Sequence, residues 1–253
     1  MSLLATALLC AVMLATAFLS GVFGMAGGMI LVGVLLAMMP VPDAMALHAV
    51  TQAASNGWRA LLWWRHVHWR ATCVFLAGTL LAMVLWSFTQ YVPDKAVALL
   101  MLGGSPLLVR LIPASLRPQP TRLSHGLGYG LVSMSLMLLT GVSGPLLDTY
   151  FLGGGMERRQ VVATKAVCQT ASHVLKYIYF SGIAASTGSV DPILATLAVG
   201  MSMLGTSLAR RFLEAMTDAQ YRLWANRIIT VISSYYLIHG TALLIQPLFA
   251  ATP

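Results

Sequence analysis

Ten apolar segments joined by short polar connections constrain the fold of this chain more than any other feature. They cover about residues 3–20, 28–40, 44–64, 72–91, 96–110, 125–142, 146–154, 160–181, 192–209 and 223–247. Several reach the ~20 residues that a helix needs to cross the ~30 Å hydrocarbon core of a bilayer. Only 9% of the 253 residues are charged, too few to cover a water-soluble domain of this length. We therefore predict an all-α, polytopic helical membrane protein whose first partner is the lipid bilayer.

The charged residues between these segments predict the orientation in the membrane. Four connections are basic, and they carry Arg59, Arg65 and Arg70; Arg110, Arg117 and Arg122; Arg158 and Arg159; and Arg210, Arg211 and Arg222. The connections between them hold Asp43, Asp94, Lys95 and Asp191. By the positive-inside rule the basic connections are cytoplasmic, so both termini are expected on the periplasmic side of a bacterial inner membrane. The net charge of +8 comes from basic residues that lie in these connections. Because they form no basic stripe with interleaved aromatic residues, we predict no nucleic-acid partner.

Two of the segments are too short to cross a bilayer, and each follows a glycine-rich break. Residues 146–154 would extend only about 14 Å as a helix. The breaks lie at residues 21–28 and 141–145, the second of which ends in Pro145. Because the predicted orientation returns the chain to the side from which it came, residues 3–40 and 125–154 are each expected to form a re-entrant-type helical hairpin that turns near the middle of the membrane.

Two sequence motifs recur in the same order in both halves of the chain. Leu-Ser-Gly-Val-Phe-Gly at 19–24 matches Leu-Thr-Gly-Val-Ser-Gly at 139–144, and Thr-Gln-Ala-Ala-Ser-Asn at 51–56 matches Cys-Gln-Thr-Ala-Ser-His at 168–173. The first hairpin enters from outside and the second from inside, so we predict two inverted-topology repeats, 1–122 with a cytoplasmic linker and 123–253, in one integrated membrane domain. Each repeat holds a broken hairpin plus three spanning helices, which is typical of secondary transporters with a site at the midplane.

A polar stripe on the helix after each hairpin forms the candidate site. Equivalent positions, spaced by 4, 3, 1 and 3 residues, hold His48, Gln52, Ser55, Asn56 and Arg59 in the first half and Lys165, Gln169, Ser172, His173 and Lys176 in the second. Polar groups at this depth mark either a substrate pathway or hydrogen bonds between helices. We favour substrate binding for Gln52 and Gln169 and leave both roles open for the two serines. Arg59 and Lys176 are expected near the membrane interface.

Two charged residues of the second half have open roles. Lys165 lies near the start of its helix, so it either faces the site or snorkels to the cytoplasmic surface. Asp148 is the one carboxylate predicted inside the membrane away from a connection. It either neutralises Lys165 or carries a proton coupled to transport.

The hairpin turns favour an anion for a separate reason. The N-terminal N–H groups of each return limb point at the turn and give that end a partial positive charge. Gly24, Gly27, Gly28, Ser143 and Gly144 are therefore candidate binding positions, although glycines at such turns also allow close helix packing. The predicted substrate is a small anion held between the two turns.

Other chemistry lacks a sequence signal. Cys10, Cys73 and Cys168 are widely spaced, and His66 and His68 stand without further ligands, so we predict no metal site. P-loop, His-Glu-x-x-His and Gly-x-Ser-x-Gly motifs are missing from the sequence. We therefore predict that the chain is not an enzyme and uses no cofactor.

The chain resembles the TauE/SafE family of sulfite-exporter-like permeases over nearly its full length, most clearly around the two turns. The resemblance rests on segments 21–32, 49–52, 65–70, 141–148 and 163–176. It implies an inner-membrane exporter of an anion such as sulfite, an organosulfonate or an organic acid. The departures from the commoner family form, at Thr51-Gln52 and at 143–146, lie in the predicted site and leave the substrate open.

Two other functions stay open at this point. A cation or metal transporter would use His48, His173 and Asp148, but buried carboxylates are scarce. A non-transport membrane enzyme or assembly factor would need a nucleophile with a base or a metal cluster. The direction of transport, the coupling ion and the formation of a homo-oligomer are not determined by the sequence.

Overall fold

The computed structural model describes residues 2–112, 118–120, 122–152 and 156–250, and within these ranges the regular structure is entirely helical. The helices are α1 (Leu3–Phe23), α2 (Ala26–Met38), α3 (Val41–Trp63), α4 (Trp69–Thr89), α5 (Lys95–Arg110), α6 (Leu123–Thr140), α7 (Gly144–Leu152), α8 (Arg158–Ile178), α9 (Pro192–Ala215) and α10 (Asp218–Ala250). A 3-10 turn, Trp64–His66, follows α3, and a π-helical turn, Tyr179–Ile183, extends α8. The predicted all-α class is confirmed.

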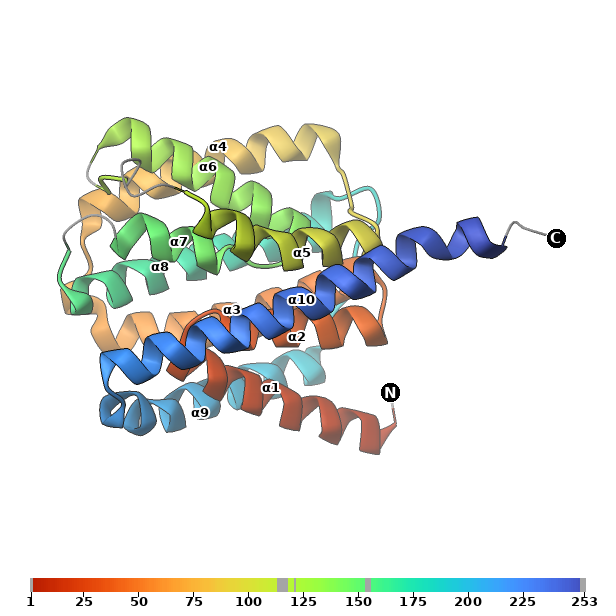
Figure 1. Cartoon of the computed structure of the whole chain (residues 1–253), viewed down its shortest axis with the longest axis horizontal. Helices are drawn as coiled ribbons and strands as arrows, with labels where there is room; N and C mark the ends of the chain where they lie inside the picture. Colours follow the sequence, from red (N-terminus) through yellow and green to blue (C-terminus); the bar gives the residue numbers. More distant parts are fainter. Residues whose placement is uncertain (1, 113–117, 121, 153–155, 251–253) are drawn as a thin grey trace.

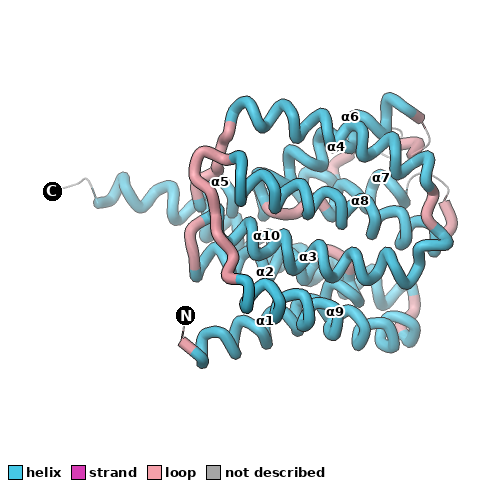
Figure 2. The backbone as a smooth tube through the Cα atoms, turned by 180° about the vertical axis from the view of Figure 1, so that it is seen from behind, coloured by secondary structure: helices cyan, strands magenta, loops and turns pink. Residues whose placement is uncertain are grey.

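The outer helices carry the apolar surface that a bilayer requires. Five described helices, α1, α4, α6, α9 and α10, contain a stretch long and apolar enough to cross a membrane. Large apolar side chains such as Leu3, Phe88 and Ile238 are more than 70% exposed, which is unfavourable in water and favourable against lipid. Figures 1 and 2 show α4 with α6 at one side of the bundle and α1 with α9 at the other. The prediction of a multi-pass helical membrane protein is confirmed.

The connections lie at two ends of the bundle and are sorted by charge. At one end, the backbone N–H of Ser189 donates to Asp43, and the N–H of Ala185 donates to the carbonyl of Gln90, which ties three connections together. The described helix ends that flank the basic connections after α3, α5, α7 and α9 point to the opposite end (Figure 1). The structure therefore separates the two groups of connections as the charge pattern predicts. Arg117 lies outside the described residues.

Helix starts and stops follow local capping chemistry. Asp94 accepts a hydrogen bond from the backbone N–H of Val97 and caps α5, and Ser2 caps α1 in the same way. Gly24 and Gly141 end α1 and α6 with φ of 72° and 84°, a backbone conformation that glycine adopts without strain. These two glycines make the hairpin turns α1–α2 and α6–α7. Pro145 is the second residue of α7, where its missing N–H costs nothing.

The first hairpin turn is narrower than the sequence predicts. Residues 21–28 were expected to form it, but Gly21 lies within α1 and Gly27 and Gly28 lie within α2. The physical reason is close packing. A Cβ at Gly21 would overlap the side chain of Ala209, and one at Gly27 would overlap the carbonyl of Thr16, so both glycines let helices approach closely.

The helices of the two chain halves pack against one another in matching pairs. Helix α1 packs on α9 and α6 packs on α4, while α3 packs on α8 and α5 on α10. By their order in the two halves, α1 corresponds to α6, α3 to α8, α4 to α9 and α5 to α10. Replacing every helix by the one it corresponds to gives the same set of packed pairs. Helices α3 and α8, which carry the polar stripes, are thus placed against each other inside the bundle.

Candidate functional site

The two hairpin turns meet inside the protein. Residues 140–147 of the second turn are all buried. A Cβ at Gly144 would lie 2.5 Å from the Cβ of Met25 in the first turn, so the two turns pack without room for a side chain at position 144. A Cβ at Gly141 would likewise crowd Val32 and Met45, at 2.8 and 3.0 Å. The turns therefore form one compact junction, with α3 and α8 beside it.

A histidine and a lysine link the polar stripes to both turns. His48 on α3 is fully buried, and its Nε2 lies 3.0 Å from the carbonyl oxygen of Gly28. The Nζ of Lys176 on α8 lies 2.7 Å from Nδ1 of His48 and donates to the carbonyl of Gly141 at 3.1 Å. The ring of His173 lies 5.6 Å from that of His48. These residues form what we call the buried basic cluster: His48, His173 and Lys176.

Lys176 corrects the expectation that it lies near the membrane interface. Its side chain is 0% exposed, and it is among the largest fully buried side chains of the protein. The sequence feature that could have indicated its burial is its place in the polar stripe, three residues after His173. Its nearness to the helix end misled the prediction, because the π-helical turn continues the helix beyond Ile178 and keeps Lys176 inside the bundle.

Several predicted site residues are buried with a polar atom that has no hydrogen-bond partner among the described residues. These atoms are Nε2 of Gln52, Nδ1 of His173 and the hydroxyls of Ser143 and Ser172. Gln52 lies beside the first turn, since a Cβ at Gly28 would be 3.3 Å from its Oε1. Gln169 is 8% exposed. Buried polar groups in native proteins are nearly always hydrogen-bonded, so such a group marks a place where a ligand or water can bind.

The antiparallel register of α3 and α8 relates these residues to each other. His48 contacts Lys176, and a Cβ at Gly57 would contact Thr170. The residues between these contact points, including Gln52 on α3 and Ser172 on α8, therefore lie at similar depths in the bundle.

Two other stripe residues have partners within the protein. The hydroxyl of Ser55 lies 2.7 Å from that of Thr206 on α9, so Ser55 joins two helices. Asn56 donates to the carbonyl of Gln52 at 2.9 Å, and its Oδ1 lies 3.5 Å from Arg59. These contacts favour the helix-joining role for Ser55, one of the two roles that the sequence leaves open.

Lys165 and Asp148 form an ion pair between α8 and α7. The side chain of Lys165 is 11% exposed, so it is held inside the protein by Asp148. A Cβ at Gly24 would lie 3.7 Å both from Nζ of Lys165 and from the hydroxyl of Tyr221, so this pair borders the first hairpin turn. The neutralising partnership between these residues, one of the alternatives drawn from the sequence, is present.

Arg59 is only partly buried and reaches back to the first hairpin. Its Nη2 donates to the carbonyl of Ser20, in the last turn of α1, at 3.1 Å. Lys176 makes the equivalent contact with Gly141 at the end of α6. In both hairpins a cation from the following helix therefore meets carbonyls at the negative end of the first limb's helix dipole.

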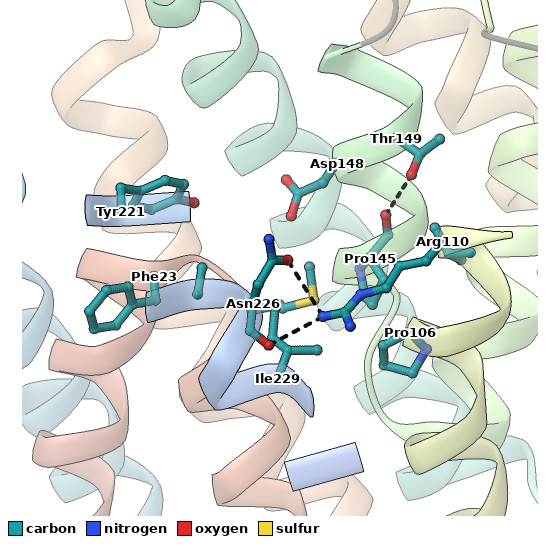
Figure 3. Close-up of a pocket in the computed structure, with 12 residues that line it drawn as sticks. Phe23, Pro106, Arg110, Pro145, Asp148, Thr149, Tyr221, Asn226 and Ile229 are labelled. Carbon is teal, nitrogen blue, oxygen red and sulfur yellow. Dashed lines mark hydrogen bonds between the residues drawn. The ribbon is translucent and has the colours of Figure 1, made fainter. Parts of the chain in front are cut away.

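A pocket of about 230 Å³ opens next to the junction of the turns (Figure 3). Its lining includes Met25 and Pro145 from the turns, and Arg110 and Asn226 from α5 and α10. Of the predicted site residues, Asp148 lines it. Sequence reasoning missed Arg110 and Asn226. Arg110 was grouped with the other arginines of a basic connection. Gln52 and Gln169 do not line this pocket, so their predicted role in substrate binding stays a prediction.

Comparison with known proteins places this geometry in a family. A family model described as "Sulfite exporter TauE/SafE" matches residues 8–236. No curated protein and no solved structure gave a match. The matched range contains every residue of the buried basic cluster, both hairpin turns and the Lys165–Asp148 pair.

Proposed function

Because the chain belongs to the TauE/SafE sulfite exporter family, we propose that it is a secondary transporter that exports a small anion across a bacterial inner membrane. Sulfite, an organosulfonate or an organic acid is the substrate class. The family is one of transporters, and the multi-pass helical fold agrees with that activity.

One observation carries the choice of an anion: Lys176 is fully buried beside two histidines, and within the described part of the chain no carboxylate pairs with it. Removing an ammonium group from water costs several kcal/mol, and neutral partners offset only part of that cost. A carbonyl and an imidazole are the partners present. An anion bound next to Lys176 would supply the missing counter-charge.

The unpartnered polar atoms supply the remaining contacts of the proposed site. The amide of Gln52 and the hydroxyls of Ser143 and Ser172 can each donate a hydrogen bond to an oxyanion, as can a protonated nitrogen of His173. Gly28 and Gly144, at the starts of α2 and α7, add the positive ends of two short helices. Gln169 belongs to the proposed site by its equivalence to Gln52.

The cation-transport alternative is disfavoured by the same cluster. His48 and His173, which would have to bind the metal, share their surroundings with the buried Lys176. A divalent cation there would be repelled by the ammonium group at close range. The arrangement attracts negative charge instead.

Inverted repeats would give the site its alternating access, and four contacts support them. His48 and Lys165 are equivalent in the stripes. His48 contacts Gly28, which lies four residues after Gly24, the last glycine of the first hairpin motif. Lys165 contacts Asp148, which lies four residues after Gly144, the last glycine of the second motif. Lys176 and Arg59 likewise contact equivalent ends of α6 and α1. We propose that one repeat rocks against the other around the junction of the turns.

Two energy sources fit the proposed export. Moving one negative charge out of a negative cell interior releases about 2.3 kcal/mol per 100 mV of membrane potential. Asp148 offers a second route, because it lines the pocket and can exchange a proton when its pair with Lys165 opens. If a proton is coupled in this way, Asp148→Asn should flatten the dependence of the transport rate on pH.

Uptake of radiolabelled sulfite into proteoliposomes tests this function. We expect uptake that saturates with sulfite and that is inhibited by other small oxyanions. Lys95→Gln, which removes a lysine at the start of α5, serves as a matched control for changes at Lys176. Uptake of sulfite, sulfonates and organic acids no faster than into protein-free liposomes would contradict the proposal.

A further inference from the structure

The pocket lined by Arg110 is an unexplained feature next to the proposed site. Its volume of about 230 Å³ exceeds what a small oxyanion needs. It lies among α5, α7 and α10 and the two hairpin turns. Arg110 is the last residue of α5, whose C-terminal end points towards the basic end of the bundle (Figure 1). The pocket thus faces the end that the charge pattern assigns to the cytoplasm.

Arg110 is held in this pocket with its charge exposed. Its Nη1 donates to the hydroxyl of Thr230 at 2.8 Å, and its Nη2 donates to the backbone carbonyl of Asn226 at 3.3 Å. Figure 3 shows the guanidinium group reaching from α5 towards Asn226, with Asp148 on the neighbouring α7. The two hydrogen-bond partners of Arg110, Thr230 and Asn226, are neutral. The side chain of Arg110 is exposed, and these hydrogen bonds hold the guanidinium group in place at the pocket.

The ion pair of Asp148 and Lys165 connects the pocket to the buried site. Asp148 lines the pocket, whereas Lys165 lies on the same stripe of α8 as Gln169 and His173. Since Asp148 is already paired with Lys165, its negative charge is largely compensated within the pocket. Arg110 therefore contributes the positive potential that an arriving anion meets first.

From these contacts we propose that the pocket is a cytoplasmic access subsite for the transported anion and that Arg110 is its recruiting cation. The Asp148–Lys165 pair separates this subsite from the buried basic cluster. An anion that reaches Lys165 competes with Asp148 for the ammonium group, so binding of the substrate opens the pair. This inference rests on the proposed function and adds residues to it on the cytoplasmic side.

Arg110→Gln, compared with Arg65→Gln, tests the subsite. Arg65 is exposed at the same end of the bundle and does not line the pocket, so its change removes the same charge elsewhere. Initial uptake of radiolabelled sulfite is measured in inverted membrane vesicles, which present the cytoplasmic face. For Arg110→Gln we expect uptake at limiting sulfite to fall about two- to fivefold, the size of one solvent-exposed ion pair. The rate at saturating sulfite should be retained, and Arg110→Lys should restore most of the loss.

Salt separates recruitment from a structural role. At roughly 1 M salt, where the Debye length is about 3 Å, the difference between the wild type and Arg110→Gln should disappear. Equal uptake by Arg110→Gln and Arg65→Gln at low salt would overturn the proposal. A loss that persists at high salt together with a lower saturated rate would also overturn it, because that result describes damaged α5–α10 packing.

A binding measurement keeps this inference distinct from the proposed function. The rise in melting temperature caused by sulfite is measured for purified wild type and Arg110→Gln in detergent at low salt. A smaller rise for Arg110→Gln supports the subsite even if vesicles show no transport. The same rise in both proteins refutes it, whereas failure of the wild type to take up sulfite, sulfonates and organic acids refutes the proposed function.

Discussion

Replacing Lys176 with methionine should weaken anion binding strongly while leaving the protein as stable as before, or more so. Methionine keeps the length and apolar stem of the side chain and removes its charge. The change breaks the contacts with His48 and Gly141. It also removes a fully buried amine whose positive charge no described carboxylate would neutralise. Lost hydrogen bonds and relieved desolvation therefore act in opposite directions on the free energy of unfolding.

The magnitudes can be worked out from these contacts. Leaving two buried partners unsatisfied costs about 1–3 kcal/mol each, and the desolvation of a buried ion is of similar or larger size. A hydrogen bond to a charged ligand contributes roughly 1.5–3 kcal/mol, which corresponds to a Kd about ten- to hundredfold weaker without it. Sulfite at about 100 times the wild-type Kd stabilises by ~2.7 kcal/mol, and a tenfold weaker Kd lowers this to ~1.4 kcal/mol.

Thermal unfolding in detergent, with and without sulfite, measures both effects. Without sulfite we expect Lys176→Met to melt at or above the wild-type temperature. With sulfite its melting temperature should rise about half as much as that of the wild type, or less. Lys95→Gln should match the wild type in both conditions. A large drop without sulfite combined with an undiminished sulfite effect would refute the reasoning, because Lys176 would then only join the helices.

Three further predictions follow from the same geometry. Gln52→Ala should weaken sulfite binding about tenfold without loss of stability, since its Nε2 has no partner in the described part of the chain. A melting temperature lowered with unchanged sulfite affinity would show a structural role instead. Ser55→Ala should lower stability by about 1 kcal/mol and leave sulfite uptake intact, because its hydroxyl contacts Thr206; a selective loss of uptake would place Ser55 in the pathway. A membrane-impermeant thiol reagent added to intact cells should label Asp43→Cys and not Arg65→Cys, in a background without the native cysteines; the reverse labelling would invert the assigned orientation.

The helices and most of their ends, apart from those at the first hairpin turn, were predictable because they depend on local chemistry. Hydrophobic runs, Gly141 with Pro145 at one break, and arginines at alternate connections are visible in the sequence. The short limb predicted at 146–154 is found as α7, Gly144–Leu152. The pairing of Lys165 with Asp148 was one of two stated alternatives, because few groups of opposite charge are available inside a membrane.

The remaining parts of the site depend on contacts that the sequence does not encode locally. Lys176 is bound by a backbone carbonyl, and any residue type can provide one. Gly27 carries the same sequence signal as Gly28, yet one packs on α1 and the other borders Gln52. Arg110 is distinguished from other arginines by Asn226, which is far away in the sequence and close only after α5 packs on α10.

The contact between Gly144 and Met25 bears on how well the membrane stays sealed during transport. The two turns touch without space for a side chain at position 144. In the proposed transport cycle, a movement of one turn would therefore displace the other turn in the same step. A leucine at position 144 would hold them apart. A gap between the turns that let protons pass would drain the membrane potential, which is a cost separate from any loss of export.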